Sequence, residues 1–211
     1  MAKAKPKVKS TAAPRRVATY KRSTGETLIY IRIDVDGTGK HNISTGLEFF
    51  DHMISQLSRH SAMDIDVTAK AKVDPDGHHT VEDVGIALGK CFNEALGDKR
   101  GIVRMAHAIV PLDEALSMVS VDISGRGYAE IDMKLTSEKL GDTLSDLLRH
   151  FLQSFAYEAR INLHANVMAG VNDHHKAEAT FKALAKALYH AAKIDPRIAG
   201  ELPSTKGVIE K

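Results

Sequence analysis

Apolar and polar residues alternate along several short segments of the chain, and this alternation predicts β-strands. Between residues 26 and 34, Ile29, Ile31 and Ile33 occupy every second position, as in a strand with one buried face. The same pattern predicts strands over residues 41–45, 63–73, 115–123, 128–135 and 161–168. Ordered structure is therefore expected to begin near Gly25.

A spacing of three or four residues between apolar positions predicts helices in the intervening segments. Two are expected over residues 47–60 and 142–159. A third pattern covers residues 84–96, after which Gly97 supplies a C-terminal stop, and a fourth includes residues 181–189. The chain thus reads as a mixture of short strands and amphipathic helices.

The second half of the chain repeats the order of elements found in the first half. Four residues have identical counterparts 88 positions later: Glu26, Asp34, Gly37 and Gly39 match Glu114, Asp122, Gly125 and Gly127. Identities in the same order, with length changes confined to predicted loops, indicate an internal duplication. The predicted fold is α+β, in which each half forms a small mixed β-sheet with two helices packed on one face.

The repeat halves are expected at residues 23–101 and 102–198, between an N-terminal tail (1–22) and a C-terminal segment (199–211). The tail carries eight Lys or Arg residues and no acidic residue. The rest of the chain carries 21 basic and 27 acidic residues, so the net charge of +2 hides an acidic body. This composition predicts a disordered, solubilising tail, with an organelle-targeting peptide or a nucleic-acid-binding arm as alternatives.

Composition excludes several classes of protein. No apolar run approaches the roughly 18–20 residues of a membrane span. Trp is absent and aromatic residues make up 5%, which argues against base-stacking surfaces for nucleic acid. The single cysteine, Cys91, falls within a helical apolar pattern, so we expect a core thiol in a reducing compartment. A cytoplasmic protein with no membrane and no nucleic-acid partner is the expectation.

One short phrase occurs twice and carries the candidate chemistry. Residues 78–82 and 174–178 both read His-His-x-x-Glu, 96 positions apart, and each precedes a helical pattern. A single His at a helix start usually serves only as a cap or a surface polar group. Its repetition, together with His52 and His150 standing 98 positions apart on the two shorter helices, argues for metal ligands instead.

The candidate metal ligands number six His and two Glu: His52, His78, His79, Glu82, His150, His174, His175 and Glu178. We group His52 with the first phrase and His150 with the second. Adjacent His side chains diverge, so the members of each pair are expected to face different ions. The set suffices for two ions with open coordination positions, and its nitrogen content favours Zn, Fe, Co, Ni or Mn. Whether one subunit or several complete each site stays open.

Anion-binding groups lie elsewhere in the chain. Arg104, Arg126 and the segment Ser204-Thr205-Lys206 offer guanidinium, hydroxyl and ammonium groups that suit a phosphate, although each alone is more often a plain surface residue. Arg126 stands out because its first-half counterpart is Thr38. A phosphate-bearing small molecule is the expected substrate.

These motifs together resemble the imidazoleglycerol-phosphate dehydratase family of histidine biosynthesis, from about residue 17 to the C-terminus. The resemblance rests on Thr45–Met53, His78–Asp83, Leu96–Gly101, Pro111–Ala115, Asp122–Arg126, Asn172–Lys176 and Leu202–Gly207. The sequence departs from the family pattern at Gly77, where Asp is usual. Either Asp76 takes over from that acid or a contact to the first His pair is missing.

The resemblance implies two Mn²⁺ ions per active site, although other divalent transition metals would fit the ligands. It also implies tandem repeats like the second domain of ribosomal protein S5. The expected assembly is a homo-oligomeric shell of 24 subunits with active sites between subunits. No separate phosphatase activity is expected.

The reaction implied is a hydro-lyase step that removes water from imidazole glycerol phosphate and gives imidazole acetol phosphate through a metal-bound imidazolate. Glu26, Glu82 and Glu178 are the implied catalytic carboxylates, with Glu26 the leading candidate for moving protons. The implied substrate contacts are Glu26, His52, Gln56, His60, His78, His79, Glu82, Arg104, Arg126, Ser204, Thr205 and Lys206.

Three other functions remain to be distinguished. A dinuclear metal hydrolase would release phosphate from the same class of substrate. A metal-storage or metal-sensing shell would bind ions without catalysis. Nucleic-acid binding through the tail predicts that deletion of residues 1–22 abolishes function, whereas the dehydratase hypothesis predicts that activity survives this deletion.

Overall fold

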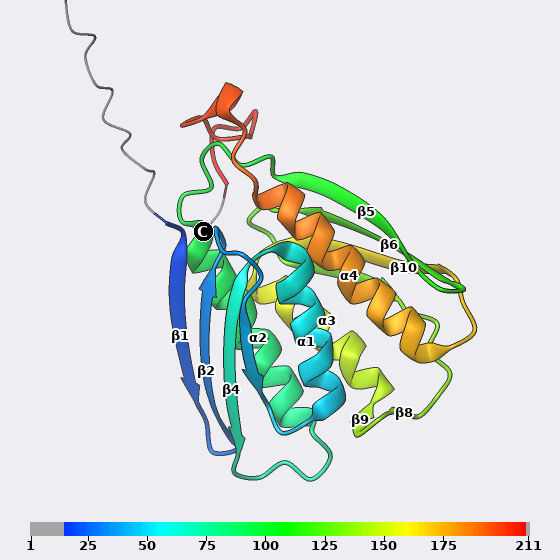
Figure 1. Ribbon diagram of the computed structural model, residues 1–211. Helices are drawn as coiled ribbons and strands as arrows, with labels where there is room; N and C mark the ends of the chain where they lie inside the picture. Colours follow the sequence, from blue (N-terminus) through cyan, green and yellow to red (C-terminus); the bar gives the residue numbers. More distant parts are fainter. Residues whose placement is uncertain (1–14, 210–211) are drawn as a thin grey trace, which may run out of the picture.

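A computed structural model of the protein describes residues 15–209 and contains two four-stranded sheets with four α-helices between them (Figure 1). The first sheet has the order β1-β2-β4-β3. Its strands are β1 (Val17–Ser23), β2 (Thr27–Asp34), β3 (His41–Ser44) and β4 (Asp64–Ala71). The helices of this half are α1 (Glu48–Ser61) and α2 (His78–Leu96).

The second half has the same topology, with a sheet of order β5-β6-β10-β7. Its strands are β5 (Met105–Leu112), β6 (Ala115–Asp122), β7 (Tyr128–Asp132) and β10 (Asn162–Ala169), and its helices are α3 (Ser145–Glu158) and α4 (Asp173–Ala192). A small hairpin, β8 (Lys139–Leu140) and β9 (Thr143–Leu144), precedes α3, and a 3₁₀ helix (Pro196–Ile198) follows α4. In both sheets three strands run as an antiparallel set and one edge strand is parallel to its neighbour. The predicted α+β duplication is confirmed.

The helices pair across the duplication, because α2 packs on α3 and α1 packs on α4. Phe151 of α3 joins the two pairs: its ring centroid lies 5.1 Å from that of Phe50 and 5.7 Å from that of Phe181. Cys91 is buried in the same core, where burial raises the pKa of its thiol to about 12, so the core-thiol prediction is confirmed. The two halves therefore share one hydrophobic core.

At Gly89, helices α2 and α3 approach each other more closely than a side chain at that position would allow. A Cβ atom added at Gly89 would lie 2.6 Å from the carbonyl oxygen of Phe155 and 2.8 Å from the amide nitrogen of Ala159. The corresponding position in α4 is Ala185. Glycine thus sets the distance between α2 and α3, and with it the spacing of the side chains those helices carry.

The expectation that ordered structure begins near Gly25, with residues 1–22 as a disordered tail, is wrong for residues 17–22. These residues form most of β1, which pairs antiparallel with β2 and places Arg22 Nε 2.6 Å from the buried Asp83 carboxylate. Residues 1–14 lie outside the described part of the chain.

The strand β5, at the same 88-residue offset from β1, was not predicted either. Both are edge strands whose residues alternate between exposed and half-buried positions, so neither carries a strong apolar alternation. Within residues 15–209, none of the helices combines the length and the apolar character that a membrane-spanning segment requires.

Candidate metal centre

Each His-His-x-x-Glu phrase lies at the N-terminus of a long helix and is held there by side-chain caps. At α4 the Asn172 side chain accepts hydrogen bonds from the amides of His174 and His175. At α2 two carboxylates take this role: Asp76 accepts from the His78 amide, and Asp74 accepts from the His79 and Thr80 amides. The caps fix the direction in which each His pair leaves its helix.

Gly77, the departure from the family pattern, sits in the left-handed region with φ of +83°, and a Cβ there would lie 3.0 Å from Leu47 Cδ1. Glycine adopts this conformation without strain, and Asp76 supplies the acid beside the His pair. The equivalent residue in the second half, Asp173, is instead buried against Thr136, Ser137 and Lys176. The backbone that leads into the His pair is therefore held differently in the two halves.

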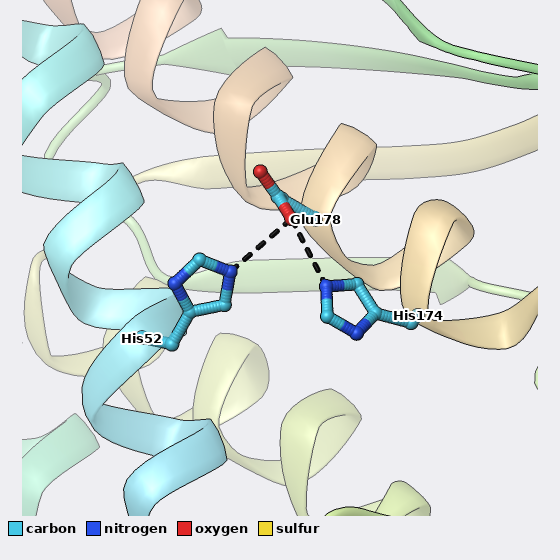
Figure 2. Close-up of side chains that lie close together, drawn as sticks. All are labelled: His52, His174 and Glu178. Atoms are coloured by element: carbon cyan, nitrogen blue, oxygen red, sulfur yellow. Dashed lines mark hydrogen bonds and ion pairs between the residues drawn. The ribbon is translucent and has the colours of Figure 1, made fainter.

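One group of possible ligands, here called the His52 cluster, combines His52 from α1 with His174 and Glu178 from α4 (Figure 2). Glu178 Oε2 lies 3.2 Å from His52 Nε2 and 3.1 Å from His174 Nε2. The possible ligand atoms of the three residues all lie within 4.8 Å of one another. Two imidazole nitrogens and a carboxylate at this spacing suit a divalent transition metal and leave further coordination positions open.

Another group, the His150 cluster, combines His78 and Glu82 from α2 with His150 from α3. His150 Nε2 lies 3.4 Å from Glu82 Oε1, and His78 Nε2 lies 3.9 Å from Glu82 Oε2. The His150 nitrogen is buried and makes no hydrogen bond. A buried nitrogen without a partner is costly for a purely structural residue but expected of a metal ligand.

The grouping of ligands by sequence half was wrong, because the two clusters exchange His52 and His150 between the halves. His52 joins the second phrase through the packing of α1 on α4, and His150 joins the first through the packing of α3 on α2. Each cluster therefore requires both halves of the chain.

His79 and His175 lie outside both clusters, and each ring is steeply inclined to that of the adjacent His. The rings of His78 and His79 are inclined by 85°, and those of His174 and His175 by 78°. His79 Nδ1 is 2.9 Å from the carbonyl oxygen of Val73, and this hydrogen bond raises the pKa of its imidazole. In both pairs the adjacent His side chains diverge, and the members of a pair do not share a cluster.

The carboxylates of the two clusters have different surroundings. Burial raises the pKa of Glu178, but hydrogen bonds from Lys182, His52 and His174 outweigh burial and hold it at about 2. Lys182 Nζ lies 2.6 Å from Glu178 Oε1. The position equivalent to Lys182 in α2 is Ile86, so Glu82 has no such cation on its own helix. Lys182 was not singled out from the sequence, because an i,i+4 Glu–Lys pair is common on helix surfaces.

Gln56 and His60 extend the His52 cluster along α1. Gln56 Nε2 is 3.4 Å from His52 Nδ1, and His60 Nε2 is 3.1 Å from Gln56 Oε1. Burial, together with the nearby charges of Lys182 and Lys186, lowers the pKa of His60. The structure thus connects Gln56 and His60, both predicted substrate contacts, to His52 through a series of side-chain contacts.

The predicted anion-binding residues meet around a small cavity of about 140 Å³. Its lining comprises Arg104, Ser124, Arg126, Ser204, Thr205, Lys206, Val208 and Ile209. The Arg104 guanidinium is bound to both oxygens of Asp122 and to the Pro203 carbonyl, so it anchors the C-terminal segment. The other predicted anion-binding residues in the lining are Arg126, Ser204, Thr205 and Lys206.

The cavity and the His52 cluster lie near opposite ends of α4. The backbone amide of Arg104 donates to the carbonyl of Ala191 near the helix C-terminus, whereas Glu178 lies in the second turn. At 1.5 Å per residue, these points on the helix are roughly 20 Å apart. One chain therefore does not bring its cavity next to its own His52 cluster.

The sequence matches a family of known proteins. The family model described as imidazoleglycerol-phosphate dehydratase matches residues 45–188. Proteins named imidazoleglycerol-phosphate dehydratase match closely: that of Dehalococcoides mccartyi strain CBDB1 is 53% identical over 93% of this chain and 98% of its own length. That of Gluconacetobacter diazotrophicus is 54% identical over 92% of this chain and 98% of its own length.

Solved structures agree with the sequence matches. The Staphylococcus aureus imidazoleglycerol-phosphate dehydratase superposes with a TM-score of 0.76 at 32% identity, covering 85% of this chain and 99% of that one. The Pyrococcus furiosus enzyme, solved in complex with (S)-C348, also gives a TM-score of 0.76, at 35% identity over 89% of this chain and 99% of that one.

Proposed function

The chain belongs to the imidazoleglycerol-phosphate dehydratase family, whose members are hydro-lyases of histidine biosynthesis, and we propose that it works with two divalent metal ions at sites shared between subunits. The observation that carries this proposal is the pair of His₂Glu clusters, each built from both halves of the chain. The substrate is imidazole glycerol phosphate and the product imidazole acetol phosphate.

The clusters fit the ions that the proposal requires. His52, His174 and Glu178 would hold one ion, while His78, Glu82 and His150 would hold the other. Three ligands leave room for a further imidazole and for substrate. When bound, the ions supply Lewis acidity and a template for the substrate's imidazole ring. We expect Mn²⁺, although the donor set also accepts other divalent transition metals.

Neighbouring subunits would supply the third imidazole and the phosphate site that one chain does not bring to its own cluster. His79 and His175 hydrogen-bond through Nδ1, to Val73 and Glu114 respectively, so Nε2 is the nitrogen that each ring keeps for an ion. A neighbouring subunit's cluster would gain its third imidazole from such a His. The roughly 20 Å between the cavity and the His52 cluster along α4 likewise argues that the phosphate site beside that cluster comes from another copy. We propose the 24-subunit shell as the assembly that satisfies both requirements.

Proton movement falls to Glu26. Its carboxylate is exposed and lies 3.5 Å from His79 Nε2, on the side of the ring that faces an ion. Glu178, with a pKa of about 2, stays ionised near neutral pH and suits a ligand better than a proton carrier. Glu82 occupies the same place in the other cluster. We therefore assign Glu26 the proton transfer and both cluster carboxylates the role of ligands.

The phosphate of the substrate would occupy the cavity beside the C-terminal segment. Arg126 and Lys206 supply charge there, and Ser204 and Thr205 supply hydroxyl donors. Gln56 and His60, in line with His52, would meet the substrate on the metal side.

Metal analysis combined with a dehydratase assay, with and without chelator, tests the proposal. The purified protein should convert imidazole glycerol phosphate, lose activity with its metal and recover both together. His79→Ala and His175→Ala should each lose metal and activity, whereas His164→Ala, an exposed position of β10, serves as the matched control. Phosphate release without dehydration would favour a hydrolase, and reversible ion binding without conversion would favour a storage or sensing shell.

A further inference from the structure

The imidazole of His175 is held from behind by a carboxylate on a different element. Its Nδ1 lies 2.7 Å from Oε2 of Glu114, which follows β5 at the turn into β6. At this distance the hydrogen bond is strong, and because a carboxylate only accepts, the proton resides on Nδ1. The free nitrogen of the neutral ring is then Nε2, which lies 3.7 Å from Asp113 Oδ2.

The Glu114 carboxylate is itself fixed. Its other oxygen, Oε1, accepts hydrogen bonds from the amides of Val171 at 3.2 Å and Asn172 at 2.8 Å, in the loop that leads into α4. The carboxylate therefore receives three N–H donors and holds both the ring and the loop that carries it. An exposed ion pair formed by chance would lack this second set of contacts.

His79, the counterpart of His175 in the first half, has different neighbours at its two ring nitrogens. Glu26, the counterpart of Glu114, lies on the Nε2 side of His79, while Val73 supplies a backbone carbonyl to Nδ1. One Glu thus faces the front of its His and the other faces the back. A carboxylate behind a ligating imidazole makes that imidazole more basic and better oriented than a carbonyl does.

We propose that Glu114 is a positioning residue that holds His175 in the tautomer with Nε2 free, so that the ion bound by His175 is held more tightly than the ion bound by His79. This inference rests on the proposed metal-dependent function. A carboxylate that hydrogen-bonds the far nitrogen of a metal-bound His typically contributes about 10–100-fold in metal affinity.

Glu114→Gln tests the proposal on the full-length protein. The single amide oxygen can satisfy the Val171 and Asn172 amides, which leaves the NH₂ group opposite Nδ1 and favours the wrong tautomer of His175. Mn²⁺ affinity is measured by equilibrium dialysis of metal-free protein against a competing chelator, with thermal unfolding and oligomeric state recorded alongside. We expect one of the two ions per subunit to bind about 10–100-fold more weakly, with the other ion and the unfolding temperature unchanged.

Asp113→Asn is the matched control for charge, because it removes a carboxylate charge 3.7 Å from His175 Nε2 and leaves the Glu114 hydrogen bond to Nδ1 intact. Unchanged affinity for both ions in Glu114→Gln would overturn the proposal. Equal weakening in Asp113→Asn and Glu114→Gln would also overturn it, since charge alone would then explain the effect. A lower affinity for both ions together with a lower unfolding temperature in Glu114→Gln would also overturn it, because Glu114 would then only stabilise the fold.

Different results would contradict the proposed function and the proposed role of Glu114. A wild-type protein that binds no metal, or that loads metal without dehydrating imidazole glycerol phosphate, contradicts the function itself. A wild-type protein that does both, with Glu114→Gln binding metal normally, contradicts only the role of Glu114.

Discussion

The two metal clusters share the same ligand types but differ in what surrounds them. Glu178 is 12% exposed and is held by Lys182, whereas Glu82 is 38% exposed and has Ile86 at the equivalent position. In the His150 cluster, the buried Nε2 of His150 makes no hydrogen bond, while in the His52 cluster Nε2 of His52 and Nε2 of His174 both hydrogen-bond Glu178. The duplication kept the ligands and changed their environment, so the two ions are expected to differ in affinity and in task.

The same divergence separates Glu26 from Glu114. Glu26 lies beside Nε2 of its His, and Glu114 beside Nδ1 of its own. On the proposals above, one ancestral carboxylate position would have become a proton carrier in one half and a positioning group in the other. Substitutions at equivalent positions of the two halves test whether the two sites differ in this way.

The largest effect is expected from Glu26→Gln. If Glu26 transfers the proton, kcat should fall about 10²–10⁴-fold, because the amide cannot accept or return it. Metal content should stay at the wild-type value, since the proposal gives Glu26 proton transfer and no role as a ligand. Steady-state kinetics with metal analysis measure both. Loss of metal in step with activity would instead place Glu26 among the ligands.

A large effect on stability is expected from Arg22→Ala. Arg22 pairs with the buried Asp83, and leaving that carboxylate without its cation should lower the free energy of unfolding by about 3–5 kcal/mol. The second half has Val110 and Ala179 at the equivalent positions. The double variant Arg22→Val/Asp83→Ala should recover much of the loss, although Thr27 loses its acceptor. Denaturant unfolding measures this, and a double variant no more stable than Arg22→Ala would show that the pair cannot be exchanged for an apolar contact.

The place of Arg22 in β1 also corrects the expectation that deletion of residues 1–22 leaves activity intact. Such a deletion removes most of β1 and the cation beside Asp83. We now expect a chain that starts at residue 23 to be less stable and less active than one that starts at residue 15.

Gly89→Ala should lower the free energy of unfolding by about 1–3 kcal/mol, because the new methyl group overlaps the α3 backbone. Displacing α3 also moves His150 from Glu82, so the His150 cluster should lose metal affinity and the His52 cluster should not. The counterpart change, Ala185→Gly, should cost about 1 kcal/mol through helix propensity. Denaturant unfolding and metal titration measure the two effects. Equal loss of both ions in Gly89→Ala would mean that the clusters do not respond independently.

The smallest effect concerns acid stability of the metal-free protein. The pKa of Glu178 is lowered to about 2 in the folded state, so its contribution to stability is present above its unfolded pKa, near 4.5. That contribution is lost as the pH falls toward 2. Lys182→Met should raise this pKa and shift the acid-unfolding midpoint to higher pH. Circular dichroism during acid titration measures the shift, and Ile86→Met is the control expected to show none.

Much of the fold could be predicted from the sequence, because local patterns determine it. Ile29, Ile31 and Ile33 mark the buried face of β2, and the repeated phrase marks the starts of α2 and α4. The edge strands β1 and β5 were missed because half-exposed strands lack that alternation.

The assembly of the site was harder to predict than its residues. His52 is close to Glu178, 126 positions away, only because α1 packs on α4, and no local spacing reports this contact. The role of Glu114 behind His175 likewise depends on a turn 61 positions away. Local pattern identifies ligand types, whereas tertiary packing decides which of them meet.

Anomalous diffraction from crystals of the Mn²⁺-loaded protein tests the central claim most directly. We predict two ions per subunit, one on His52, His174 and Glu178 and the other on His78, Glu82 and His150. Each should be completed by the Nε2 atom of a His79 or His175 from a neighbouring subunit. An ion held by both members of one His pair within a single subunit, or the absence of ions from these clusters, would contradict the account.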